Sequence, residues 1–167
     1  MRIEKHLEAL GIVLTTPAAG VGQYGQRYGR MKSHFLSGKL LFLGGHTAGM
    51  LDGQARYPGR LGHDVSIEDG YQAARLTAIN CISTIKRAIG DLDRVTAIVS
   101  SLNFVACTPD FTEHYKVTNG LSELLESVFG PDIGVGARAS MGAPSLSDNY
   151  CFETSLTVQV DDAPALS

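Results

Sequence analysis

Apolar residues at helical spacing mark two long helices in the middle of the chain. Between Ser66 and Gly90, apolar side chains recur every three or four residues, the pattern of a helix with one buried face. Ser66 and Asp69 have the spacing of an N-terminal capping pair, and Gly90 is placed to end the helix. A second helical pattern opens at Thr108-Pro109, where proline suits the first turn, and stops at Gly130-Pro131. We therefore expect two long helices, each with one apolar face.

Three further segments have the pattern of strands. Residues 34–45 hold two apolar runs joined by Ser37-Gly38, which predicts a hairpin. Residues 95–105 carry apolar side chains on both faces, as expected of a central, covered strand. The last strand alternates instead. One of its faces carries Tyr150, Phe152, Leu156 and Val158, and the other carries Glu153, Ser155, Thr157 and Gln159.

The order of these elements predicts an α+β fold in which two helices cover one face of a sheet. A short helix is added at residues 1–11, because Ile3, Leu7 and Leu10 recur at helical spacing and Gly11 is placed to end it. The glycine-rich segment 51–64 is predicted as an exposed loop. The polar face of the last strand carries little charge, so we expect it to pack against other copies of the chain.

Length and composition favour one domain that spans residues 1–167. Apolar residues make up 44% of the chain, which argues against disorder. The net charge of −3 gives no basic surface for nucleic acid or an anionic membrane. No apolar run reaches the length of about 18 residues that a transmembrane helix needs. The charged N-terminus lacks the apolar core of a signal peptide, and the three cysteines show no paired spacing, so we expect a cytoplasmic protein.

The stretch from residue 134 to residue 160 holds the candidate chemistry. Arg138 stands alone among small residues, and Glu153 follows 153 − 138 = 15 positions later in the last strand. A guanidinium can bind a carboxylate with two parallel hydrogen bonds, and a glutamate fixed beside it can hold a water or accept its proton. The residues alone leave open that both are ordinary surface side chains. The histidines lack the spacing of a metal motif, so neither a metal nor a cofactor is predicted.

Several segments in a fixed order carry a family resemblance. The matching segments are Gly22-Gln23-Tyr24-Gly25-Gln26, Leu43-Gly44-Gly45, residues 90–95, residues 109–112, and Ala137-Arg138 followed by Glu153. With these segments the chain resembles the reactive-intermediate (imine) deaminases, the Rid or YjgF-like proteins, some of which are labelled L-PSP endoribonucleases. The resemblance covers most of the chain from about Tyr24 onward. The predicted N-terminal helix is similar to that of the longer branch of the family.

This resemblance implies a chorismate-mutase-like fold that assembles as a homotrimer with a cleft at each subunit boundary. Arg138 would bind the carboxylate of a 2-imino acid in that cleft. Glu153 would hold the hydrolytic water, and the products would be a 2-keto acid and ammonia. The substrate-binding residues would be Tyr24, Gly45, Asn119 and Ser140.

The chain also departs from the family pattern. Gly44-Gly45-His46 replaces S-G-Q, Ser140 replaces a cysteine, Ser155 replaces the second glutamate of E-x-E, and residues 145–149 replace an L-P-x-G loop. These changes keep the carboxylate anchor but leave the substrate open. An alternative function is therefore a trimeric protein that binds a small carboxylate without turnover. Ribonuclease activity rests only on the family label, and the acidic net charge argues against it.

Overall fold

The computed structural model describes residues 2–14, 28–29 and 31–161. The elements in chain order are α1 (Arg2–Ala9), β1 (His34–Ser37), β2 (Leu40–Leu43), β3 (His46–Thr47), β4 (Met50–Leu51), β5 (Gln54–Ala55), α3 (Ile67–Ile89), η1 (Leu92–Arg94), β6 (Val95–Ala106), α4 (His114–Phe129), α5 (Pro131–Gly134), β7 (Ala137–Ala143), η2 (Ser147–Asn149) and β8 (Phe152–Val160). None of the helices in these ranges is long and apolar enough to cross a membrane.

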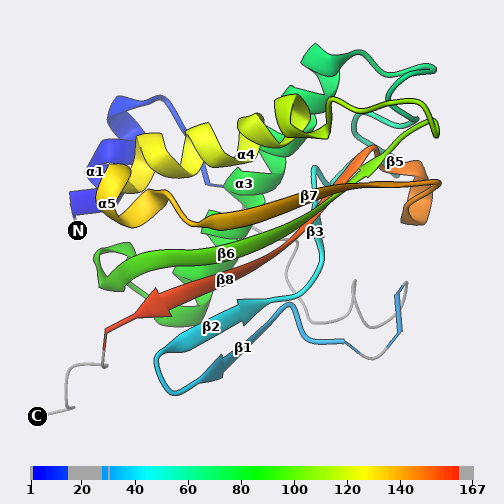
Figure 1. The fold of residues 1–167 in the computed structure, drawn as a ribbon. Coiled ribbons are helices and arrows are strands. Elements are labelled where there is room, and N and C mark those ends of the chain that lie inside the picture. Colours follow the sequence, from blue (N-terminus) through cyan, green and yellow to red (C-terminus); the bar gives the residue numbers. More distant parts are fainter. Residues whose placement is uncertain (1, 15–27, 30, 162–167) are drawn as a thin grey trace, which may run out of the picture.

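A six-stranded sheet forms one layer of the fold. Its order is β1-β2-β8-β6-β7, and the short strand β3 also pairs with β8. The pairings are antiparallel except for β6 and β7, which run parallel. The helices lie together on one side of this sheet (Figure 1). The predicted α+β layer with helices on one face is therefore confirmed, and α1 and α5 join the two long helices on that face.

The core lies between the sheet and the two long helices. The predicted apolar stripe of α3 is buried there, and Ala74, Ala78, Ile82 and Ile85 have no exposed surface. Leu156 and Val158 meet this stripe from β8, and Leu121 and Leu125 meet it from α4. Burying each such leucine or isoleucine contributes about 1.5–3 kcal/mol to folding, so this contiguous cluster holds the layers together.

The ends of α3 follow the sequence signals. The backbone N–H of Asp69 donates to Ser66 Oγ at 3.0 Å, and the Ser66 hydroxyl donates in turn to the Asp69 carboxylate at 2.7 Å. At the other end, Gly90 has φ +80° and its N–H donates to the Lys86 carbonyl. α3 and α4 then pack closely, because a Cβ on Gly120 would overlap the Tyr71 carbonyl. Only glycine permits this approach.

Two predicted elements are present with small differences. The hairpin forms, but its turn is Gly38-Lys39, since Ser37 is already paired with Leu40. The N-terminal helix ends at Ala9, before the predicted Gly11, and Leu10 is 43% exposed. The buried stripe of α1 is therefore limited to Ile3 and Leu7.

Two local predictions are wrong, and one strand was not predicted. The segment 51–64 is not simply an exposed loop, because it contains β4 and β5 and its Leu61 is fully buried. The Leu61 N–H donates to the Ala106 carbonyl, and the Thr108 N–H donates to the Leu61 carbonyl. This pairing keeps Thr108 extended, so α4 begins at His114 instead of at Thr108-Pro109. Finally, no strand was predicted around Arg138, which lies on β7.

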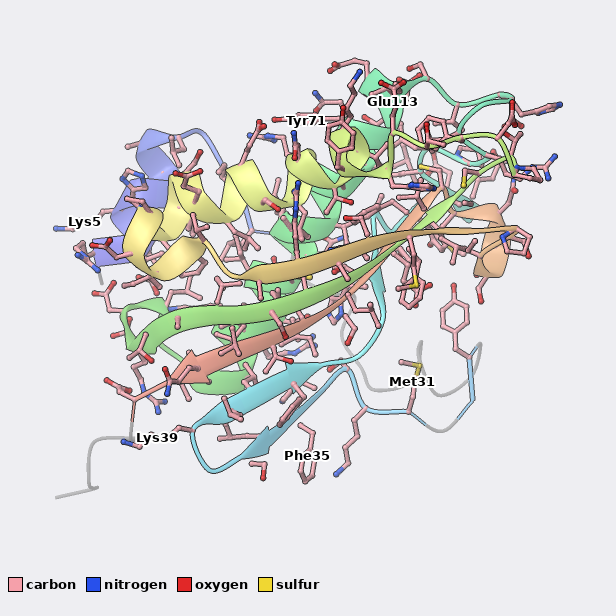
Figure 2. All side chains as sticks on the ribbon, in the orientation of Figure 1. Lys5, Met31, Phe35, Lys39, Tyr71 and Glu113 are labelled. Atoms are coloured by element: carbon pink, nitrogen blue, oxygen red, sulfur yellow. The ribbon has the colours of Figure 1, made fainter. Side chains whose placement is uncertain are left out.

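The face of the sheet away from the helices is open. The predicted alternation of β8 is confirmed, and Glu153, Ser155, Thr157 and Gln159 lie on this face. The face is less polar than β8 alone suggests, because Phe35, Phe42, Leu102 and Met141 join it and are 40–55% exposed. Figure 2 shows Phe35 pointing away from the layers. The strand β6 is central in the sheet, as predicted, but within the single chain the helices cover only one of its faces (Figure 1).

Candidate functional site

Arg138 is held in a fixed orientation by two side chains of α4. Its Nη1 donates to Ser122 Oγ at 2.9 Å, and its Nη2 donates to Asn119 Oδ1 at 2.8 Å. These two acceptors stand three residues apart, so they lie on the same side of the helix. Within the described part of the chain, no carboxylate forms an ion pair with Arg138. The exposed guanidinium thus keeps its charge and several N–H donors for an anionic ligand.

A cavity of about 280 Å³ lies beside this guanidinium. Its polar lining comes from Ser101, Asn119, Ser122, Glu123, Glu126 and Arg138. The carboxylate of Glu123 accepts a hydrogen bond from Tyr71 Oη at 2.6 Å, and this contact raises the pKa of Tyr71. The volume suits a small molecule rather than a polymer.

Ser140 continues the same line of side chains along β7. Its hydroxyl donates to Thr118 Oγ1 at 2.9 Å, and Thr118 donates to the His114 carbonyl at 3.1 Å. The predicted neighbours Arg138, Asn119 and Ser140 are therefore brought together under α4. Sequence analysis missed Ser122 and Thr118, although the spacing of three between Asn119 and Ser122 on a predicted helix was a usable signal.

Glu153 lies half-buried on the open face, against Gly45. β3 pairs with β8, so Thr47 stands opposite Glu153 and brings the preceding glycine close. A Cβ on Gly45 would overlap Glu153 Oε1, which shows that the carboxylate rests on the Gly45 backbone. In the parts of the chain that are described, no group donates a hydrogen bond to this carboxylate. Burial without a partner raises the pKa of Glu153, because the charged form loses hydration.

A single chain does not bring Arg138 and Glu153 together. Arg138 is paired across the sheet with Ser101, which is paired with the fully buried Leu156, so Arg138 is on the helix side. Glu153 is paired with Phe104 on the opposite, open side. Gly45 accompanies Glu153, and Tyr24 lies outside the described residues. The predicted site is thus divided into an arginine half and a glutamate half.

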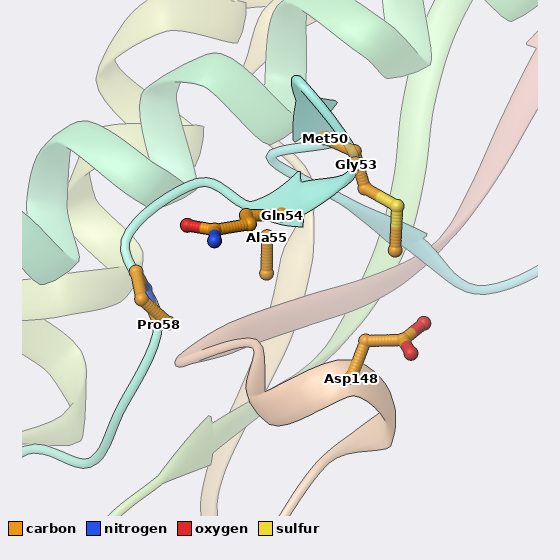
Figure 3. Close-up of a pocket in the computed structure, with 6 residues that line it drawn as sticks. All are labelled: Met50, Gly53, Gln54, Ala55, Pro58 and Asp148. Carbon is orange, nitrogen blue, oxygen red and sulfur yellow. The ribbon is translucent and has the colours of Figure 1, made fainter.

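A second cavity, of about 260 Å³, lies between the β4–β5 hairpin and η2 (Figure 3). Asp148 is the one ionisable side chain among the six that line it, and its carboxylate also accepts a hydrogen bond from Tyr28 Oη. Asp148 belongs to the segment that replaces the family's L-P-x-G loop. Neither Arg138 nor Glu153 lines this cavity. We therefore place the candidate chemistry elsewhere.

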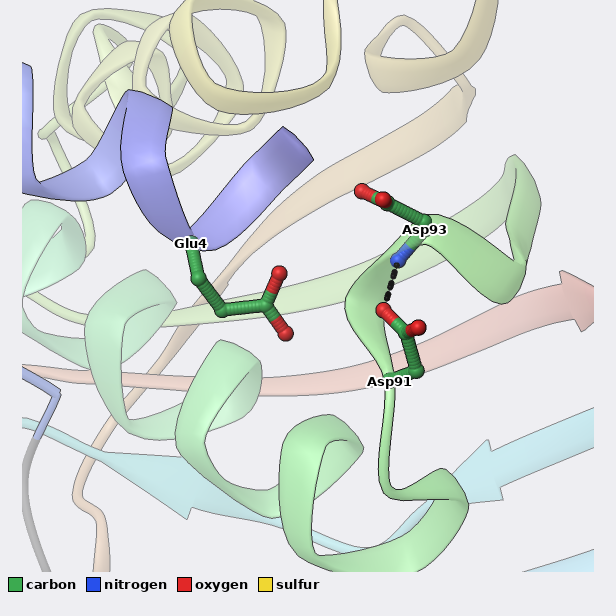
Figure 4. A group of neighbouring side chains, drawn as sticks. All are labelled: Glu4, Asp91 and Asp93. Carbon is green, nitrogen blue, oxygen red and sulfur yellow. Dashed lines mark hydrogen bonds between the residues drawn. The ribbon is translucent and has the colours of Figure 1, made fainter. Parts of the chain in front are cut away.

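Three carboxylates, those of Glu4, Asp91 and Asp93, gather at the N-terminal helix (Figure 4). Their contacts are structural. Glu4 accepts from Lys86 Nζ and from the Leu92 N–H, and Asp93 accepts from the backbone N–H groups at the start of α1. Asp91 accepts from the Asp93 N–H at 3.0 Å. These bonds dock α1 on the turn before β6, and the prediction that no metal is required stays a prediction.

Comparisons with known proteins agree with this architecture. A family model described as "YjgF/chorismate_mutase-like, putative endoribonuclease" matches residues 4–155. A curated relative, "Protein TCP17" of Trypanosoma cruzi, is 34% identical over 164 residues, which is 96% of each chain.

Two crystal structures are similar over nearly the whole chain. The protein Atu1372 from Agrobacterium tumefaciens, described as having unknown function, is 32% identical and has a TM-score of 0.82. The match covers 95% of this chain and 92% of that one. A protein from Shewanella oneidensis described as a putative endoribonuclease is 28% identical, with a TM-score of 0.83 and coverage of 95% and 99%.

Proposed function

This chain belongs to the YjgF/chorismate-mutase-like family, and from that premise we propose that it hydrolyses 2-imino acids to 2-keto acids and ammonia. The observation that carries the proposal is Arg138. Its guanidinium is fixed by Asn119 and Ser122 but has no carboxylate partner within the described ranges. A bidentate contact with a substrate carboxylate would supply that partner.

The chemistry needs little beyond positioning and one activated water. An imine carbon is already electrophilic, so a water held beside it can add once a base takes one of its protons. Glu153 is suited to that role because its carboxylate is half-buried and has no other hydrogen-bond donor in the described part of the chain. The water oxygen becomes the keto oxygen, the C–N bond breaks, and the nitrogen leaves as ammonia after gaining two protons.

The divided site leads us to propose a homotrimer. Arg138 and Glu153 lie on opposite faces of one sheet, so a site that contains both takes one residue from each of two subunits. The open face supports this assembly, because Phe42, Leu102 and Met141 are partly exposed beside Glu153 and Ser155. Apolar side chains of this kind are usual at interfaces between subunits. The proposed partner at the site is therefore a second copy of this chain, with a small carboxylate as ligand.

A cytoplasmic location belongs to the same proposal. The three cysteines are free and buried, and burial raises the pKa of Cys151 to about 12. Buried, reduced thiols are typical of a reducing compartment.

The test is the release of keto acid from imines that an amino-acid oxidase generates in situ. Wild-type protein should accelerate it, and Arg138→Ala should remove the effect, since each charge-assisted hydrogen bond contributes about 1.5–3 kcal/mol. Arg138→Lys should recover little, because a lysine cannot reproduce the planar fork. The exposed Glu8→Gln on α1 serves as a matched surface control.

The same experiment addresses the alternative function. If the wild type binds 2-keto acids through Arg138 but never accelerates imine hydrolysis, the chain is a carboxylate-binding protein. The alternative is favoured by Ser155, which stands at the position of the family's second glutamate. Its hydroxyl donates a hydrogen bond to the Leu43 carbonyl at 2.9 Å, so this position supplies no second carboxylate. An Arg138→Ala variant as active as the wild type would contradict both functions.

A further inference from the structure

We propose that His46 is a positioning residue that holds the Gly44-Gly45 backbone and thereby keeps the Glu153 carboxylate in its half-buried place. The inference rests on the proposed function, in which Glu153 activates the water. It concerns a residue that departs from the family pattern, where glutamine follows the corresponding serine-glycine pair. His46 itself would touch neither the substrate nor the water.

His46 is enclosed and bonded at both ring nitrogens. Its side chain is 2% exposed, Nδ1 lies 2.8 Å from the Gly44 carbonyl, and Nε2 lies 2.9 Å from Thr84 Oγ1. A carbonyl oxygen only accepts, so Nδ1 carries the proton and donates it to Gly44. Nε2 then accepts from the Thr84 hydroxyl. The ring thus ties the chain just before β3 to the C-terminal half of α3.

This tie acts at the place where Glu153 is supported. Gly45 stands between Gly44 and His46, and its backbone is the surface on which the Glu153 carboxylate rests. His46 is paired with Thr154, the residue after Glu153, in the β3–β8 ladder. On the other side, the Gly44 N–H donates to the Ser33 carbonyl at 3.0 Å. A movement of Gly44-Gly45 would therefore open the glutamate to water.

Burial favours the neutral form of the His46 ring, which is the form that can bond to both Gly44 and Thr84. Burial lowers the pKa of His46, and the positive side chain of Arg87 on α3 and His34 on β1 lower it further, against the raising effect of the Gly44 carbonyl. The neutral ring keeps one donor and one acceptor, as Gly44 and Thr84 require.

Two amide substitutions separate the halves of this contact. The side-chain amide of asparagine reaches about as far as Nδ1, and that of glutamine about as far as Nε2. His46→Asn can therefore still donate to the Gly44 carbonyl, whereas His46→Gln can reach Thr84 but leaves Gly44 unsupported. Thr84→Val removes the other end of the tie. Thr77→Val is the matched control, because Thr77 is also a buried α3 threonine, and its hydroxyl donates to the Ala73 carbonyl instead of to His46.

The decisive measurement is the carboxyl titration of Glu153, followed by ¹³C NMR in the full-length protein. We expect the midpoint to fall in His46→Gln, because added hydration favours the charged carboxylate. His46→Asn should stay near the wild type, Thr84→Val should fall by less than His46→Gln, and Thr77→Val should lose stability without a change in Glu153. The acid limb of the kcat/KM profile should move in the same direction as the NMR midpoint.

If the His46→Gln variant folds and its Glu153 titrates with the wild-type midpoint, the proposal is overturned. If His46→Gln does not fold, Thr84→Val decides, and an unchanged Glu153 midpoint in that variant overturns the proposal as well. An equal shift in Thr77→Val would also do so, since the effect would then reflect general loosening of α3. The titration does not depend on turnover. If the Glu153 midpoints change as predicted but the wild type does not hydrolyse imines, the proposed function is contradicted and the positioning role of His46 still stands.

Discussion

Gly45→Ala is the substitution for which the structure makes the sharpest prediction. The new Cβ would overlap Glu153 Oε1 and would lie 3.1 Å from Glu153 Cδ. The obstacle is the end of a flexible side chain, so the backbone can stay in place while the carboxylate turns away. The variant should therefore fold, but with its glutamate displaced.

The magnitude follows from the small size of that displacement. Turning a side chain about 30° from its preferred rotamer costs roughly 0.5–1.5 kcal/mol, so we expect a loss of about 1 kcal/mol in the free energy of unfolding. Catalysis should suffer more, because moving a reacting group by about 1 Å can lower a rate on the order of 100-fold. Gly45 has no positive φ, so alanine adds no backbone strain of its own.

Urea denaturation in two backgrounds, combined with the imine-hydrolysis assay, would test this reasoning. In Glu153→Ala, the overlap partner is absent, and Gly45→Ala should be neutral or stabilising by about 0.5 kcal/mol through the unfolded state. The difference between the two backgrounds is the coupling energy between the two residues. Equal costs in both backgrounds, or a Gly45→Ala enzyme with the wild-type rate, would falsify the placement of Glu153 against Gly45.

Three further predictions concern pH, packing and assembly. The pKa of Glu153 is raised in the folded state, so the folded protein binds the Glu153 proton more tightly than the unfolded chain does. This stabilisation is lost as the pH rises through the pKa that Glu153 has in the folded state. Glu153→Gln should therefore be more stable than the wild type at pH 7 but not at pH 3, as measured by denaturation at both pH values. Leu61→Ala should lower the free energy of unfolding, measured in urea, by about 2–5 kcal/mol. Leu51→Ala, at a site that is 57% exposed, should change this free energy by less than about 0.5 kcal/mol. Similar losses in the two variants would contradict the packing of the 51–64 segment. Phe42→Lys should dissociate the proposed trimer in sedimentation equilibrium, and a monomeric wild type would exclude the shared site.

The sequence was most informative where local chemistry determines structure. The Ser66 cap, the Gly90 stop and the alternation in β8 each depend on residues that are neighbours along the chain. α3, the hairpin and the two faces of β8 could therefore be predicted with nearly their observed limits. Asn119 was also expected at the site, but only through the family resemblance, and its hydrogen bond with Arg138 was not predicted.

Long-range pairing decided what the sequence could not. β7 is rich in small residues and has no strand pattern, and it is extended because it pairs with β6. Leu61 stands in a glycine-rich segment and is buried because its backbone bonds to Ala106 at the end of the same strand. Polar contacts between distant segments, such as that of His46 with Thr84, leave no periodic signal in the chain.

The separation of 15 residues between Arg138 and Glu153 suggested a single site, but sequence distance does not define which face of a sheet a side chain occupies. That face depends on the pairing register, which puts Arg138 in line with the buried Leu156 and Glu153 in line with Phe104 on the open side. A shift of one residue would reverse either side chain, because successive side chains point to opposite faces. The sequence thus determined which groups are present, and the tertiary structure decided that a single chain keeps them apart.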